Sequence, residues 1–171
     1  MTDTKRMPIS VSSAVYIFDN KGKILLLKHI CRDGVEKWGP PAGGIEPHET
    51  PLDTAIRETY EEIGLKPTLK DIIGIYTLDR GDNPSGIGFN FRGTINGEIK
   101  LNEFEACDYK YVDFKELKEL YSSNKIYKPE YATCAIRDIL LGNSYPLTII
   151  NPLMTSVRKY VPEFRLASND S

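Results

Sequence analysis

Apolar residues at the start of the chain fall into two short runs that predict β-strands. One run covers residues 11–18 and the other covers residues 23–30, and both are rich in β-branched, aliphatic or aromatic side chains. The polar run 19–22 between them ends in glycine, and such a turn between two apolar runs is typical of a β-hairpin. The segment 33–47, dense in glycine and proline, then predicts a surface loop without regular helix or strand.

The hydrophobic period changes to that of an amphipathic helix between Pro51 and Ile63. Thr50 is a favoured N-cap residue, proline suits the first helical position, and Gly64 can end the helix in a left-handed conformation. At about 100° per residue, the apolar side chains share one arc, which we expect to pack on a core. This arc contains Leu52, Ala55, Ile56, Tyr60 and Ile63. We expect the acidic residues on the other side of the helix to face outward.

The remaining pattern predicts further strands and helices. The strands cover residues 72–78, 87–95, 98–101 and 107–112, and the helices cover residues 114–121 and 131–141. The pair Asn96 and Gly97 predicts a hairpin turn between the second and third of these strands. From Asn151 onward the pattern is mixed, and we expect the C-terminal tail to be frayed from about residue 163.

Length and composition predict one compact domain over residues 1–171. The chain is 40% hydrophobic and 27% charged, which suits a domain with a substantial core. With 22 basic and 24 acidic residues the net charge is −2, so no global field attracts nucleic acid or an anionic membrane. The N-terminal residues lack the apolar core of a signal peptide, and no apolar run reaches membrane-spanning length. We therefore expect a cytoplasmic protein.

Cysteine and histidine do not form ligand patterns in this sequence. Cys31, Cys107 and Cys134 lack the spacing of a zinc site or a disulfide framework, and free cysteines tend to be interior. We expect three buried free thiols. His29 and His48 are isolated, and we expect ordinary structural or surface roles for both.

Three glutamates of the predicted helix form a candidate metal site. Glu58, Glu61 and Glu62 lie within an arc of about 100°, an arrangement that by itself is typical of a solvated helix surface. Carboxylates this close repel, and they stay ionised together only when well solvated or when cations lie between them. Oxygen ligands favour magnesium, and the lack of thiolate or histidine ligands argues against zinc.

The spacing around this helix matches a known pattern. A glycine is followed after five residues by a glutamate and after seven more by an Arg-Glu pair, and two adjacent glutamates and a glycine come next. The residues are Gly43, Glu49, Arg57, Glu58, Glu61, Glu62, Gly64 and Leu65. This pattern resembles the sequence box of the Nudix hydrolases, which include the MutT-like proteins. Thr59 stands where the family prefers an aliphatic residue, and we expect its hydroxyl to bond the carbonyl four residues earlier.

The resemblance implies a fold, a metal and a set of site residues. The fold is α/β, an α/β/α sandwich with a mixed central sheet, and the metal is magnesium, for which manganese can substitute. The family's metal ligands correspond to Glu58, Glu61 and Glu62, together with the main-chain carbonyl of Gly43. Metal ions would clamp the pyrophosphate oxygens and activate a water molecule for attack on phosphorus.

The resemblance also assigns supporting roles. The general base is either Glu61 or Glu105, which precedes a predicted strand, and the sequence does not decide between them. The resemblance places Arg57 among the catalytic residues. We expect Arg57 to form an ion pair with Glu49 that fixes the glycine loop against the helix. A solvated surface pair is the alternative. The residues that contact substrate are not identified by the sequence.

The function predicted from the resemblance is magnesium-dependent hydrolysis of a pyrophosphate bond in a nucleoside diphosphate derivative, with a nucleoside triphosphate or related nucleotide as the leading substrate. The alternatives are an ADP-ribose or sugar-nucleotide pyrophosphatase, an isopentenyl diphosphate isomerase, and a non-catalytic nucleotide-binding module. We expect a small-molecule nucleotide as partner, with neither nucleic acid nor membrane, and analogy with relatives leaves a homodimer open.

Overall fold

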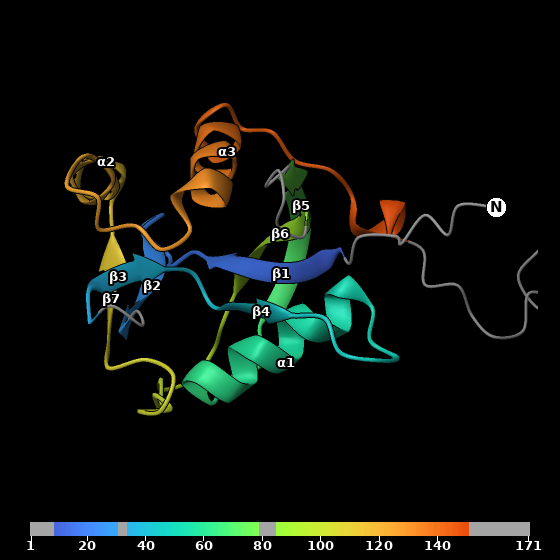
Figure 1. Cartoon of the computed structure of the whole chain (residues 1–171), viewed down its shortest axis with the longest axis horizontal. Helices are drawn as coiled ribbons and strands as arrows, with labels where there is room; N and C mark the ends of the chain where they lie inside the picture. Colours follow the sequence, from blue (N-terminus) through green and yellow to red (C-terminus); the bar gives the residue numbers. More distant parts are fainter. Residues whose placement is uncertain (1–8, 31–33, 79–84, 151–171) are drawn as a thin grey trace, which may run out of the picture.

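The computed structural model describes residues 9–30, 34–78 and 85–150. The elements in these ranges are β1 (Ser10–Ile17), β2 (Ile24–Ile30), β3 (Glu36–Gly39), β4 (Ala42–Gly44), α1 (Pro51–Ile63), β5 (Thr68–Leu78), β6 (Gly86–Thr94), β7 (Asp108–Val112), α2 (Phe114–Ser122), α3 (Pro129–Leu140) and the 3-10 helix η1 (Leu147–Ile149) (Figure 1). No helix in the described part of the chain is both long and apolar enough to cross a membrane. The predicted fraying from residue 163 lies outside the described residues.

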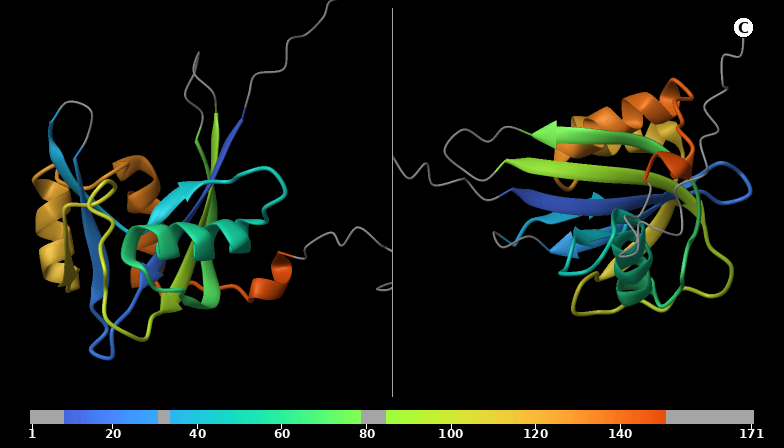
Figure 2. Two further views of the ribbon diagram at one scale, coloured as in Figure 1. Left: turned by 90° about the horizontal axis from the view of Figure 1, so that it is seen from below. Right: turned by 90° about the vertical axis from the view of Figure 1, so that its right-hand side faces the viewer.

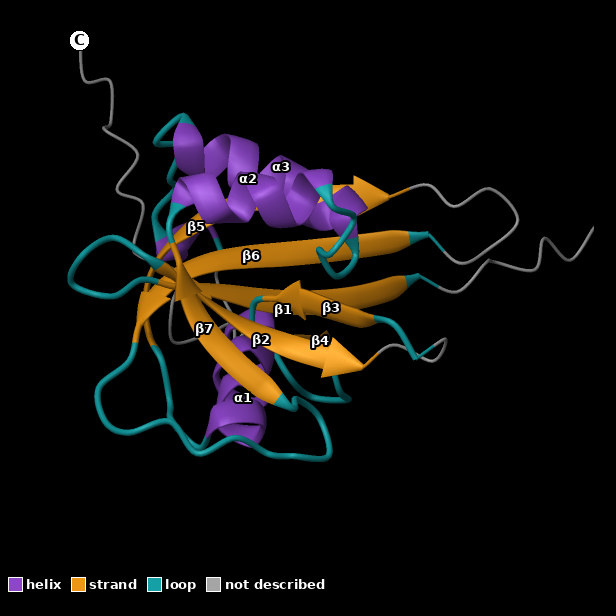
Figure 3. Cartoon of the chain, turned by 90° about the vertical axis from the view of Figure 1, so that its left-hand side faces the viewer, coloured by secondary structure: helices purple, strands orange, loops and turns teal. Residues whose placement is uncertain are grey.

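The strands form two sheets between layers of helices. One sheet has the order β4-β1-β6-β5 and the other has the order β3-β2-β7. The β1–β6 pair is parallel and the remaining pairs are antiparallel, so the four-stranded sheet is mixed. Helix α1 lies on one side of the strands, and α2 and α3 lie on the other (Figures 2 and 3). The predicted α/β/α arrangement with a mixed sheet is confirmed.

The predicted N-terminal hairpin is wrong. Phe18, just after β1, forms an isolated antiparallel bridge with Ile24, and the two strands belong to different sheets. Their residues are buried on both faces: Leu25 contributes to the core beneath α1, whereas Leu26 contributes to the core beneath α2 and α3. A continuous apolar run is typical of a strand covered on both sides, and separating the two strands lets each of them be covered in this way.

The predicted loop 33–47 contains two short strands, β3 and β4. Strand β4 pairs with β1, with Gly43 opposite Ser13 and Ala42 opposite Ala14. The glycines of β4 do not break regular structure here. Gly43 allows close packing, because a Cβ at this position would collide with the carboxylate of Glu58.

The predicted strand 98–101 and its hairpin turn are also wrong. Residues 98–101 pair with none of the strands in the described part of the chain, and they lie against the C-terminal end of α1. There the amide of Lys100 donates to Ile63 O at 2.9 Å, and the amide of Asn102 donates to Glu62 O at 2.9 Å. The last carbonyls of a helix need donors from elsewhere, and this segment supplies two of them.

The predicted ends of α1 are confirmed. Thr50 and Asp53 form a capping box, and Gly64, with φ of 71°, donates its amide to Tyr60 O at 2.8 Å. One position of the apolar arc is wrong, because Tyr60 is 52% exposed. Thr59 is buried instead, and its hydroxyl donates to Ala55 O at 2.8 Å, as expected for this departure from the family pattern.

The expectation of three buried thiols is wrong for at least one cysteine. Cys107 is exposed and Cys134 is partly buried, and both are free; Cys31 lies outside the described residues. Cys107 immediately precedes β7, which is an edge strand and therefore is less covered than the strands in the middle of the sheets.

Candidate active site

Helix α1 carries its glutamates in three different environments. Glu61 is exposed, Glu58 is partly buried, and Glu62 is only 3% exposed. The prediction that all three face outward is therefore wrong for Glu62. At about 100° per residue, Glu62 lies only about 20° from Ala55 around the helix, so it belongs to the margin of the buried side.

A fourth glutamate from a distant segment completes an acidic cluster. Carboxylate oxygens of Glu58, Glu62 and Glu105 all lie within 4.8 Å of one another. Glu105 is exposed and belongs to the turn that follows the segment packed against the end of α1. The cluster therefore combines one buried, one partly buried and one exposed carboxylate.

Asn102 connects the Glu105 turn to the helix. Its amide donates to Glu62 O, as described above, and its carbonyl accepts from the amide of Glu105 at 2.9 Å. Its side-chain amide donates to Glu105 Oε1 at 3.1 Å. The same residue thus fixes the main chain of the turn and the carboxylate that the turn presents.

Burial and mutual repulsion make this cluster hard to ionise in the absence of cations. Burial, followed by the negative charges of Glu58 and Glu105, raises the pKa of Glu62 to about 9. The amide of Ala42, which donates to Glu62 Oε2 at 3.2 Å, opposes this rise only in part. Burial also raises the pKa of Glu58, despite its contact with Arg57. The cluster thus fits a divalent cation, which would supply the missing positive charge to hard oxygen ligands.

Gly43 allows strand β4 to approach this cluster. A side chain at this position would occupy the space of the Glu58 carboxylate, whereas a Cβ at the neighbouring Gly44 would meet no atom within 4 Å. The main chain of Gly43 and the carboxylate of Glu58 are therefore in direct contact. The main chain of Gly43 thus lies beside the cluster, and the role of its carbonyl in metal binding stays a prediction.

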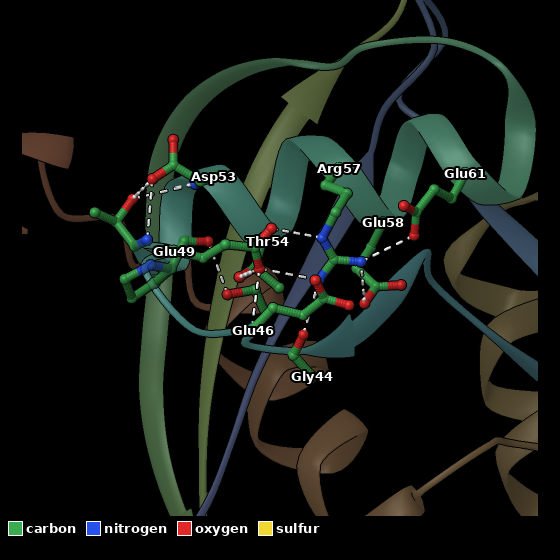
Figure 4. Close-up of polar contacts among 11 residues, drawn as sticks. Gly44, Glu46, Glu49, Asp53, Thr54, Arg57, Glu58 and Glu61 are labelled. Carbon is green, nitrogen blue, oxygen red and sulfur yellow. Dashed lines mark hydrogen bonds and ion pairs between the residues drawn. The ribbon is translucent and has the colours of Figure 1, made fainter.

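Arg57 links β4, the loop between β4 and α1, and α1 itself (Figure 4). Its guanidinium donates to Glu49 at 2.6 and 3.0 Å, to Gly44 O at 2.9 Å, and to Glu58 and Glu61 at 2.9 Å each. The predicted ion pair with Glu49 is present, and it is part of a larger network instead of an isolated surface pair. The contact with Arg57 is the first cause that lowers the pKa of Glu49 to about 2.

Replacing Arg57 with lysine should weaken this network. Lysine keeps the positive charge, but it lacks the planar guanidinium with which Arg57 bonds several acceptors at once. We therefore expect kcat to fall about 10-fold to 100-fold. The free energy of unfolding should fall by about 1–2 kcal/mol, a value that allows for partial solvent screening. Steady-state kinetics and urea unfolding measure the two effects.

Arg137→Lys is the matched control, because the Arg137 side chain is 61% exposed and its ion pair is with the adjacent Asp138. We expect both quantities to stay near the wild-type values in this variant. Equal effects of the two substitutions would show that the fork of Arg57 has no special role.

The structure does not bring Glu61 into the acidic cluster. Its carboxylate accepts from Arg57 Nη1 and its side chain is 44% exposed, whereas Glu105 takes the third place beside Glu58 and Glu62. Of the two candidate bases, Glu105 is therefore the one that lies within the cluster. The assignment of Glu61 as a metal ligand stays a prediction.

A hollow adjoins Gly43 on the face of the sheet away from α1. It is a shallow hollow that is open to solvent, with a cavity volume of about 50 Å³. On β1, Ser13 donates its hydroxyl to Pro51 O at the α1 side, and the alternate residues line the hollow. The lining includes Ser12, Ala14, Tyr16, Asn90, Tyr127 and Tyr131. The acidic cluster and the hollow therefore meet at β4.

Two residues around the site have positions that the sequence analysis missed. Asn90 is 3% exposed and lines the hollow, and its side-chain amide donates to Gly88 O at 3.4 Å. His29, expected to have an ordinary role, contacts the Glu105 turn. The sequence does contain a signal for Asn90, because a polar residue stands between Phe89 and Phe91 in a predicted strand. It contains no signal for the contact between His29 and the Glu105 turn.

Comparison with known families identifies a match that spans most of the chain. A family model described as the NUDIX domain matches residues 8–133, which include the glycine segment, α1, the Glu105 turn and both sheets. The match covers more than half of the chain.

Curated relatives in this family carry pyrophosphohydrolase or pyrophosphatase names. The chain is 28% identical to an RNA pyrophosphohydrolase of Bartonella clarridgeiae, over 73% of this chain and 88% of the relative. It is 35% identical to an RNA pyrophosphohydrolase of Bartonella tribocorum, over 71% and 86%. It is 31% identical to an ADP-ribose pyrophosphatase of Methanocaldococcus jannaschii, over 66% and 68%.

Solved structures support the same fold. A NUDIX hydrolase from Nitrosomonas europaea superposes with a TM-score of 0.72 and 26% identity, covering 84% of this chain and 96% of that one. A MutT protein from Methanosarcina mazei Go1 gives a TM-score of 0.65 at 23% identity, covering 82% and 99%, and this likeness concerns the fold alone.

Proposed function

The chain belongs to the NUDIX domain family, and on that basis we propose that this pyrophosphohydrolase acts on nucleotides whose 5′ phosphate carries further phosphate groups. A free nucleoside triphosphate and the 5′ end of an RNA share this chemistry. The observation that carries the proposal is the acidic cluster of Glu58, Glu62 and Glu105, in which the buried Glu62 has a raised pKa and needs a nearby positive charge in order to ionise at neutral pH.

The residues of the cluster would hold a divalent metal, most simply magnesium. When bound, the metal would supply charge neutralisation for the phosphate oxygens and activation of water. The chain itself would hold the ligands in place: the capped helix fixes Glu58 and Glu62, Asn102 fixes Glu105, and Arg57 fixes the glycine segment against the helix.

Glu105 is our candidate for the group that accepts the proton of the attacking water. Its carboxylate lies in the cluster and is open to solvent, whereas the carboxylate of Glu61 is engaged by Arg57. A base must be within hydrogen-bond reach of the proton that it accepts, and geometry favours Glu105 in this respect.

The names of the relatives and the lining of the hollow favour this class of substrate. Curated relatives named RNA pyrophosphohydrolases favour an RNA 5′ end over the sequence-based expectation that no nucleic acid binds. The shallow hollow beside β4 presents tyrosines and Asn90, side chains that can stack on or hydrogen-bond to the base of the nucleoside that precedes the first phosphate. ADP-ribose is the second candidate, favoured by the relative that bears this activity in its name.

A release assay tests the proposal. The protein is incubated with magnesium or manganese and with four substrates: a nucleoside triphosphate, a short RNA with a 5′ triphosphate, ADP-ribose and isopentenyl diphosphate. We expect phosphate or pyrophosphate from the first two, and loss of that release in EDTA and in Glu105→Gln. Glu61→Gln is run in parallel and should retain more activity than Glu105→Gln if Glu105 is the base.

Each other outcome has a definite meaning. Release from ADP-ribose alone would favour the second candidate substrate. A shifted double bond in isopentenyl diphosphate, without phosphate release from any substrate, would favour the isomerase, although the described cluster contains carboxylates and no cysteine or histidine. Nucleotide binding without any turnover would indicate a non-catalytic module and contradict the proposal.

A further inference from the structure

His29 on β2 contacts both the Glu105 turn and the wall of the hollow. Its Nδ1 lies 3.1 Å from Glu105 O. Its ring stacks on Tyr127, with 5.2 Å between ring centroids and an interplanar angle of 29°. Tyr127 lines the hollow, and Glu105 belongs to the acidic cluster. The His29 side chain therefore contacts one residue of the acidic cluster and one residue that lines the hollow.

The chemistry of the first contact fixes the direction of the hydrogen bond. A carbonyl oxygen only accepts, so Nδ1 must carry the proton and donate it to Glu105 O. In the neutral ring Nε2 is then an acceptor. It is buried and has no partner among the residues that the structure describes. Burial, the leading cause, lowers the pKa of His29, which agrees with a neutral ring.

The Glu105 turn is held from two directions. On the helix side, Asn102 joins it to the end of α1, as described above. On the sheet side, the amide of Cys107 donates to Lys28 O at 2.9 Å, and His29 donates to the carbonyl of Glu105 itself. Of these two sheet-side contacts, only the His29 contact is made to Glu105 itself. Its loss would leave Glu105 held by Asn102 from the helix side.

Tyr127 depends on the same region for its position. Its main chain pairs with Trp38 through an amide that donates to Trp38 O at 2.8 Å, and its Cβ would lie 3.1 Å from a Cβ at Gly39. These contacts fix the backbone and the start of the side chain. The stacked ring of His29 then limits how the tyrosine ring can turn toward or away from the hollow.

We propose that His29 is a positioning residue with two separable actions: its Nδ1–H fixes Glu105 in the acidic cluster, and its ring fixes the Tyr127 wall of the hollow. The inference rests on the proposed function, which assigns Glu105 to metal binding or proton transfer and assigns the hollow to the nucleoside. It predicts that the first action affects kcat and metal affinity, and that the second affects KM.

Two substitutions separate these actions. His29→Phe keeps an aromatic ring against Tyr127 and removes the donor. We expect kcat and manganese affinity to fall about 10-fold or more, as for other residues that orient a metal ligand, with KM within about twofold of wild type. His29→Asn keeps a donor near the Nδ1 position and removes the ring. We expect KM to rise about 2-fold to 10-fold with kcat nearly unchanged.

The measurements use the full chain. Steady-state kinetics with the best substrate of the release assay give kcat and KM, and manganese binding followed by electron paramagnetic resonance gives affinity without turnover. His48→Asn is the control, because His48 is exposed, has φ of 72°, and asparagine tolerates that conformation. Thermal unfolding of every variant identifies changes that come from loss of folded protein.

The outcomes distinguish this inference from the proposed function. If wild type hydrolyses no substrate, the proposed function fails, whereas weaker manganese binding in His29→Phe but not in His29→Asn still supports the link to Glu105. If both variants change kcat and KM by the same factor, or if His29→Phe keeps wild-type kcat and manganese affinity, the inference is overturned.

Discussion

Replacing Glu62 with glutamine is expected to lower kcat at least about 1,000-fold, because it removes a negative ligand from the buried side of the acidic cluster. The fold should survive. Glutamine has the same shape and can still accept the amide of Ala42, and at pH 7 the metal-free wild type holds Glu62 in its neutral form, given a pKa of about 9. Phosphate release under saturating magnesium and circular dichroism measure the two expectations.

Glu119→Gln on the exposed surface of α2 is the matched control, and it should behave as wild type in both assays. Hydrolysis by Glu62→Gln at more than about a tenth of the wild-type rate would contradict the role assigned to the cluster.

The same substitution should change how stability depends on pH in the metal-free protein. The folded state keeps the Glu62 proton up to about pH 9, whereas the unfolded state releases it near the ordinary glutamate pKa. Stability from this group is therefore complete below the unfolded pKa and declines as pH rises toward 9, by at most about 1.4 kcal/mol per pH unit. The glutamine variant should lack this decline. Urea unfolding in EDTA from pH 5 to 9 tests it, and parallel curves would refute it.

Gly43→Ala is expected to lower kcat about 100-fold or more, while Gly44→Ala should have little effect. A methyl group at position 43 would occupy the space of the Glu58 carboxylate, so that carboxylate must leave its place in the cluster. A methyl group at position 44 would meet no atom within 4 Å. Neither glycine has a positive φ, so the backbone accepts alanine at both positions.

The adjacent pair isolates one contact. Both variants change one glycine of the same short strand, and both should remain folded, because the obstructed group is the flexible end of a side chain. Kinetics with magnesium and with manganese, together with manganese binding, distinguish loss of metal from loss of turnover. Equal activity of the two variants would show that close packing at Gly43 is unimportant.

Local signals in the sequence were sufficient for α1 and the overall class of fold. Thr50, Pro51 and Gly64 mark the two ends of the helix, and the structure has the same bounds. The apolar runs correctly indicate strands β1 and β2, but not their partners. Strand pairing depends on contacts between residues far apart in sequence. The turn between β1 and β2 is followed by a single bridge, between Phe18 and Ile24, so the turn did not determine which strands pair.

The composition of the site was harder to predict for a related reason. Glu58 and Glu62 come from one helix and follow from its period, although the burial of Glu62 depends on β4 and on the segment that contains Asn102. Glu105 was named only through the resemblance to a family. Its contact with His29 joins residues 76 positions apart, and no periodicity connects them.

The end of α1 that bears the acidic residues is also the negative pole of the helix macrodipole. The last turn contains no basic residue, so none of its own side chains offsets that pole. Backbone dipoles and carboxylates therefore act in the same direction on any cation held there. Such a cation would serve the helix as a C-terminal counterion, and ligand binding and folding would be thermodynamically linked through this one turn.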